Sequence, residues 1–122
     1  MNDAEALART WLAGQFTTSR VVTELPDNLA DVCPVIRVTR VGGVDRETLD
    51  QARIAVECFA TTRDASRKLA ENVRDSMVKK APGQTVNGGM ITAVHTAGGP
   101  SWQPYDDPAV RMVAASYDIN IH

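Results

Sequence analysis

The residues from 51 to 60 alternate strictly along the chain, and this alternation restricts the possible folds more than any other feature. One set of alternate positions consists of Ala52, Ile54, Val56, Cys58 and Ala60. Because successive side chains of a strand point to opposite faces, the pattern predicts a β-strand with one buried face. Such a strand belongs in a sheet that is covered on one side by another layer.

Three further segments are predicted to be strands. Residues 35–41 form a β-branched run that ends at Gly42-Gly43, and residues 90–94 form another run. The C-terminal segment alternates again and has one apolar face, made of Val113, Ala115, Tyr117, Ile119 and Ile121. Residues 21–22 start only a short extended segment.

Two segments have helical periodicity. Asn2 or Asp3 can cap a short first helix, which Gly14 closes. A longer helix opens at Thr61 with a capping-box pattern and stops at Pro82-Gly83. Its apolar stripe consists of Ala65, Leu69, Val73 and Met77.

These elements follow one another in the order α-β-β-α-β-β. The expected fold is therefore α+β, with a mainly antiparallel sheet of about four strands packed against one long and one short helix. With 122 residues, the chain is expected to form a single domain over residues 1–122, because a second core would leave each half too small to fold.

Charge and composition exclude several classes of protein. The chain has 13 Lys and Arg against 15 Asp and Glu, so no overall basic field attracts nucleic acid. No apolar run approaches the ~20 residues that cross a bilayer, and the N-terminus does not resemble a secretion signal. We therefore expect a cytoplasmic site of synthesis. Cys33 and Cys58 are expected to be unrelated thiols, although the sequence also allows a disulfide between them.

Candidate catalytic residues have weak support. Ser101 follows a proline and lacks the final glycine of a nucleophile elbow. His95 has no carboxylate or cysteine beside it at metal-ligand spacing. Asp106-Asp107 could share a cation with Asp118, but two aspartates before a proline are more typical of a turn. We predict no enzyme activity, no metal site and no cofactor.

The long helix has an excess of positive charge. Six basic side chains, Arg63, Arg67, Lys68, Arg74, Lys79 and Lys80, accompany three acidic ones, Asp64, Glu71 and Asp75. Their helical spacing favours a solvated face with ion pairs over a phosphate-binding patch. No aromatic residues interleave with these charges in the manner of RNA-binding motifs.

The segment 98–111 is unusual in composition. It contains three of the six prolines and two of the six aromatic residues, Trp102 and Tyr105. Rigid loops with Trp and Tyr are typical of protein–protein hot spots. The alternative, equally supported by composition, is that both rings fold back and cover the edge of this domain's own sheet.

Three motifs together resemble one known family. They are R-V-T-R-V-G-G at 37–43, D-x-A-R-I-x-V-x-C-F-A at 50–60 and G-P-x-W-x-P-Y-D-x-P-x-V-R at 99–111. Their order and spacing are similar to those of the tail terminator proteins of long-tailed bacteriophages, especially those that infect actinobacteria. The similarity runs from about residue 20 to the C-terminus, and the third motif is its most distinctive part.

The resemblance implies a structural virion protein at the junction of tail and neck, assembled in the host cytoplasm. Such a subunit forms a homohexameric ring, caps the tail tube, ends its polymerisation and joins the head connector. DNA passes through the ring without specific binding. Expected interface residues are Trp102, Tyr105, Asp106, Arg111, Arg37 and Arg40. Arg37, Arg40 or the basic helix could meet Asp45, Glu47 or Asp50 of a neighbouring subunit.

Two alternatives remain open from the sequence. One is a neighbouring neck or head-completion adaptor, which would bind the head portal in place of the tail tube. The other is a small-molecule-binding α+β domain whose Gly/Trp/Tyr loop closes over a pocket. Gly42-Gly43 and the loop beyond it are expected to be a mobile segment that orders on docking.

Overall fold

The computed structural model describes residues 4–45 and 50–122. Its helical elements are α1 (Ala4–Gln15), α2 (Leu29–Val32), α3 (Arg63–Asp75) and the π-helical turn η1 (Ser76–Lys80), which continues α3. Its strands are β1 (Arg20–Val22), β2 (Val35–Asp45), β3 (Asp50–Ala60), β4 (Thr85–Val86), β5 (Gly89–Gln103) and β6 (Arg111–Ile121).

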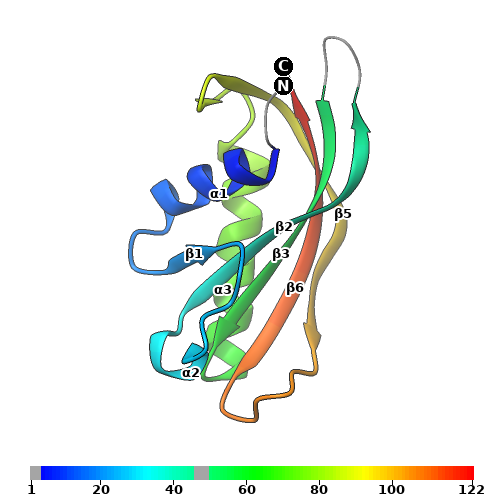
Figure 1. Ribbon diagram of the computed structural model, residues 1–122. Coiled ribbons are helices and arrows are strands. Elements are labelled where there is room, and N and C mark those ends of the chain that lie inside the picture. Colours follow the sequence, from blue (N-terminus) through cyan, green and yellow to red (C-terminus); the bar gives the residue numbers. More distant parts are fainter. Residues whose placement is uncertain (1–3, 46–49) are drawn as a thin grey trace.

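All six strands form one mixed sheet in the order β1-β2-β3-β6-β5-β4. Strand β1 runs parallel to β2, and every other neighbouring pair is antiparallel. The sheet curls into a half-barrel, and α1 and α3 lie together on one of its faces (Figure 1). The expected fold of about four strands with one long and one short helix is therefore wrong.

The additional elements are those with the weakest sequence signal. Strands β1 and β4 have three and two residues, which is too short for alternation to be recognised. Helix α2 has four residues and makes only about one turn. Gly98, Gly99 and Pro100 predicted a loop over 98–111, but residues 98–103 belong to the second half of β5.

The main core lies between the sheet and the helices. Alternate residues of β3 and β6 face the helices, as the alternation predicts, and Tyr117 is the largest fully buried side chain. In α3 the buried stripe begins at Ser66 and Ala70, whereas Ala65, expected in the stripe, is exposed. The cap is Thr62, whose Oγ1 accepts a hydrogen bond from the Ala65 N–H at 3.1 Å. The expected cap, Thr61, is one residue too early.

A smaller apolar cluster lies on the opposite face of the sheet, at one end. Leu29 of α2, Val35, Phe59 and Val110 form its buried centre. The segment from β1 to β2 and the loop from β5 to β6 fold over this end of the sheet and supply most of its partly buried members. The remainder of this face is left uncovered by the helices (Figure 1).

Two strands contain irregularities. The register of β2 against β3 shifts between Arg40 and Gly42, so the glycines expected to end the strand lie inside it. The register of β5 against β6 shifts three times, between residues 91 and 101. Bulges of this kind bend a strand and increase its twist.

Candidate assembly surface

Trp102 is a large exposed apolar side chain near the end of β5. It pairs with Val113 of β6, whose side chain is in the main core, so the indole lies on the side of the sheet where α3 packs. Its exposed fraction is 43%. The Arg63 guanidinium carbon lies 5.0 Å from the centre of the ring, within the range of a cation–π contact.

A groove between α3 and β5 surrounds this tryptophan, and we call it the tryptophan groove. Its lining residues are Arg63, Arg67, Glu71 and Arg74 of α3, Pro100 and Trp102 of β5, and Val113. Its volume is about 350 Å³. Arg67 forms ion pairs with Asp64 at 2.8 Å and Glu71 at 2.9 Å, which leaves the groove with a net positive charge.

Tyr105 has different surroundings. Its ring packs edge-on against Phe59, with the ring centres 5.1 Å apart, and it belongs to the smaller apolar cluster. For the segment 98–111, the sequence left open whether its two aromatic rings form a protein–protein contact or cover this domain's own sheet, and the two rings differ in this respect. Tyr105 folds back onto the sheet, whereas Trp102 keeps an exposed surface.

Charged residues after Tyr105 form hydrogen bonds within the turn that precedes β6. The Asp107 carboxylate accepts a hydrogen bond from the Ala109 N–H at 2.9 Å, as expected for a turn-forming aspartate. The Arg111 guanidinium donates to the Pro108 carbonyl at 2.7 Å. Asp106 is exposed. A contact of Asp106 or Arg111 with a partner stays a prediction.

The two arginines predicted in β2 lie on opposite faces of the sheet. Arg37 pairs with Glu57 across the strands at 2.6 Å on the face away from α3 and lies 5.9 Å from the Phe59 ring centre. Arg40 lies on the helical side, where its N–H donates to Glu5 of α1 at 2.9 Å. The structure therefore does not bring Arg37, Arg40 and Trp102 into one patch.

A second cross-strand ion pair was missed from the sequence. Arg53 of β3 binds Asp118 of β6 through two hydrogen bonds, of 2.9 and 3.2 Å. The Arg53 guanidinium holds the pKa of Asp118 below its usual range. Both residues occupy outward positions of their alternating patterns, but the pairing of β3 with β6 was needed to place them opposite each other.

The acidic residues proposed to meet these arginines are near the hairpin between β2 and β3. Asp45 and Asp50 are the paired ends of the two strands. Glu47 lies outside the described residues, and so does most of the loop after Gly42-Gly43. The pairings and the mobility of this loop stay predictions.

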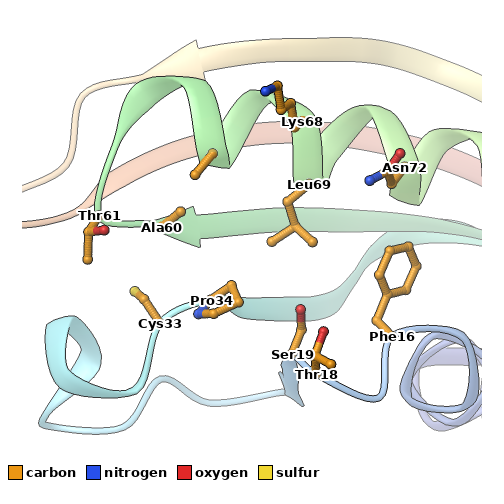
Figure 2. A pocket seen from close by; sticks show the side chains of 11 residues that line it. Phe16, Thr18, Ser19, Cys33, Pro34, Ala60, Thr61, Lys68, Leu69 and Asn72 are labelled. Carbon is orange, nitrogen blue, oxygen red and sulfur yellow. The ribbon is translucent and has the colours of Figure 1, made fainter.

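A second cleft, shown in Figure 2, separates α3 from the start of β2 and has a volume of about 380 Å³. Leu69 and Phe16 extend into it, and Cys33 and Thr61 lie near one end (Figure 2). None of its lining residues comes from the segment 98–111. The loop therefore does not cover this cleft, although Pro100 and Trp102 line the tryptophan groove.

Comparison with known proteins identifies the family. The sequence model of the family described as phage tail termination protein matches residues 1–122. The chain belongs to this phage tail termination protein family. It is therefore a structural protein of the bacteriophage tail, from a family of virion components.

The fold of this tail termination protein also occurs in a solved virion. A chain in the structure titled virion of native gene transfer agent particle has a TM-score of 0.69 and 11% identity. The alignment covers 97% of the tail termination protein and 93% of the virion chain. A search of curated proteins by sequence found no match.

Among residues 4–45 and 50–122, no three His, Cys, Asp or Glu side chains gather as a metal-binding group. In the same residues, no helix is long and apolar enough to span a membrane. Cys33 and Cys58 are both free thiols, as expected for unrelated cysteines.

Proposed function

We propose that this chain forms, as a single domain, a homohexameric ring that caps the tail tube and ends its polymerisation. The opposite face of the ring would present the joining surface for the head connector. Membership of the phage tail termination family over the whole chain is the observation that carries this proposal. The ring would occupy the tail–neck junction of the virion after assembly in the host cytoplasm.

The distribution of surface features supports a subunit with several contacts. A closed ring needs two different patches on each subunit, because each subunit meets one neighbour with each patch. The tryptophan groove at one edge of the sheet can supply one of them. The uncovered face of the sheet, with its ion pairs Arg37–Glu57 and Arg53–Asp118, is a separate polar surface.

The charge of the chain supports passage of DNA without specific binding. The net charge is −2, so the protein as a whole does not attract the phosphate backbone. Three of the six basic side chains of α3 are paired with acids on the same helix, namely Arg67, Lys68 and Lys79. These ion pairs along the helix lower the positive charge that α3 offers to a phosphate backbone.

The function can be tested by polymerising the tail tube protein with and without this chain. We expect bound rings at tube ends in electron micrographs and an arrest of further growth when fresh tube protein is added. Unchanged growth with bare tube ends would overturn the proposal. Binding to the head portal with no binding to the tube would identify a neck or head-completion adaptor.

A further inference from the structure

We infer that the tryptophan groove of one subunit receives an acidic segment, residues 23–31, from a second copy of the same chain. This inference rests on the proposed ring and names the contact that closes it. The acidic segment runs from the end of β1 into α2 and carries Glu24, Asp27 and Asp31. It contains no Lys or Arg.

The two surfaces have complementary charge. Glu24, Asp27 and Asp31 are all exposed, and in the part of the chain that the structure describes none of them forms an ion pair. In the groove, Arg63 faces only the Trp102 ring, and Arg74 has no ion pair among the described residues. Each surface thus presents charges that its own subunit leaves unpaired.

The groove and the acidic segment also match in their apolar parts. Trp102 presents an exposed ring beside Pro100. The acidic segment carries Leu25 and Pro26 between its first two carboxylates, and both are only half-buried. Burial of Trp and Arg in a shared pocket is the usual composition of an energetic hot spot.

Their positions on the sheet favour a contact between neighbours in a ring. One row of paired residues crosses the sheet from Trp102 through Val113, Cys58 and Ile36 to Val21. The acidic segment begins directly after β1, at the far end of this row (Figure 1). The groove and the start of the acidic segment therefore lie towards opposite edges of the sheet and at the same level along the strands.

This placement determines the type of assembly. Two different patches at opposite edges join subunits head to tail. Because the acidic segment starts at the level of Trp102, a neighbour can be added beside the subunit with little displacement along the strands. A series of head-to-tail contacts forms a ring when the rotation between neighbouring subunits closes, and a helical filament when it does not.

The contact can be tested by reversing one charge on each surface. Arg74→Glu changes the groove, and Asp27→Lys changes the acidic segment. Lys80→Glu is the matched control, because Lys80 is an exposed residue of η1 that does not line the groove. Circular dichroism establishes that each variant is folded, and light scattering after size exclusion, over a hundredfold range of concentration, gives its mass.

We expect each reversal alone to weaken assembly by about tenfold or more, since it places like charges together. The control should assemble as the unchanged chain does. A 1:1 mixture of the two variants should recover the ring. In a hexamer the two variants can alternate, so that every groove meets a segment of opposite charge.

Loss of the ring in each single variant, together with its recovery in the mixture, supports the contact. Rings that persist in either single variant, or a mixture that fails to recover, overturn it. An unchanged chain that stays monomeric at every concentration also overturns it. The tube-capping assay distinguishes failure of this contact from failure of the proposed function. If the chain caps tubes and both charge-reversed variants still form rings, the proposed function stands and only this contact is overturned.

Discussion

Tyr105 and Trp102 are three residues apart and have opposite relations to the fold. Tyr105 packs against Phe59 and closes one end of the sheet, whereas Trp102 remains exposed beside Arg63. Substitution of the first removes contacts within the subunit. Substitution of the second removes a surface that the subunit does not need in order to fold.

Replacement of Tyr105 by Ala is expected to lower the free energy of unfolding by about 2 kcal/mol, because the contact of this half-buried ring with the buried Phe59 is lost. Trp102→Ala is the matched comparison and should cost less than about 1 kcal/mol. Urea unfolding followed by circular dichroism measures both. Equal losses of unfolding free energy in the two variants would contradict the assignment of Tyr105 to the packed cluster and of Trp102 to the exposed surface.

The two thiols should also differ in reactivity. Burial, together with the nearby Glu57, raises the pKa of Cys58 to about 12, while Cys33 is only half-buried. Because the thiolate is the reactive form, a thiol reagent at pH 8 should modify Cys33 in the folded protein and leave Cys58 unmodified. Two reactive thiols should be counted after denaturation. Rapid reaction of both in the folded chain would show that Cys58 is accessible.

At the scale of elements, the length of each segment determined how well it could be predicted. The ten-residue alternation of β3 and the apolar face of β6 gave the correct buried faces. Strands β1 and β4 have only three and two residues, which is too short for an alternation of apolar and polar side chains. They are extended because they pair with neighbouring strands, and the sequence alone did not show this. The second half of β5 contains Gly98, Gly99 and Pro100, and only its pairing with β6 holds it extended.

The candidate surface was predictable in composition but not in arrangement. The sequence identified Trp102 and the charges of α3, yet it could not place them on two sides of one groove. Arg37 and Arg40 are three residues apart in β2, so the period of two already separates their faces. The acidic segment has no motif, and its relation to the groove depends on the order of strands in the sheet.

The start of α3 provides a matched test of capping. Thr62→Ala should lower the free energy of unfolding by about 1 kcal/mol, because the hydroxyl that accepts from the Ala65 N–H is lost. Thr61→Ala changes the neighbouring residue in the same way and should have little effect. Thermal unfolding of the two variants, compared with the unchanged chain, measures the difference. A larger loss of stability in Thr61→Ala than in Thr62→Ala would show that Thr61 is the cap, as the sequence predicted.

The ion pair between β3 and β6 should give a stability difference that depends on pH. Arg53 lowers the pKa of Asp118 in the folded protein, so the pair stabilises the fold at pH values above the unfolded pKa of about 4. Asp118→Asn should therefore reduce stability slightly at pH 7. The difference from the unchanged chain should disappear as the pH falls through the folded pKa. A difference that persists at pH 2 would have another origin.

At the scale of the whole molecule, a ring closed by charged patches should respond to salt. The screening length falls from about 10 Å at 0.1 M salt to about 3 Å at 1 M. We expect a species near six times the 13.2 kDa chain mass at low salt and smaller species at 1 M NaCl. Sedimentation velocity measures this change, and circular dichroism controls for unfolding. A mass that does not change with salt would indicate an apolar interface.

The three register shifts of β5 also bear on aggregation. Within the described residues, the first two positions of this fifteen-residue strand pair with β4, and Ile91 exchanges backbone hydrogen bonds with Gly83 and Gln84; the residues after Ile91 form an open edge of the sheet. A long regular edge is a template for fibril growth, since each added strand exposes a new edge. The shifts break the edge of β5 into short runs that are out of phase with one another. We therefore expect the irregular register of β5 to disfavour the stacking of this strand into fibrils.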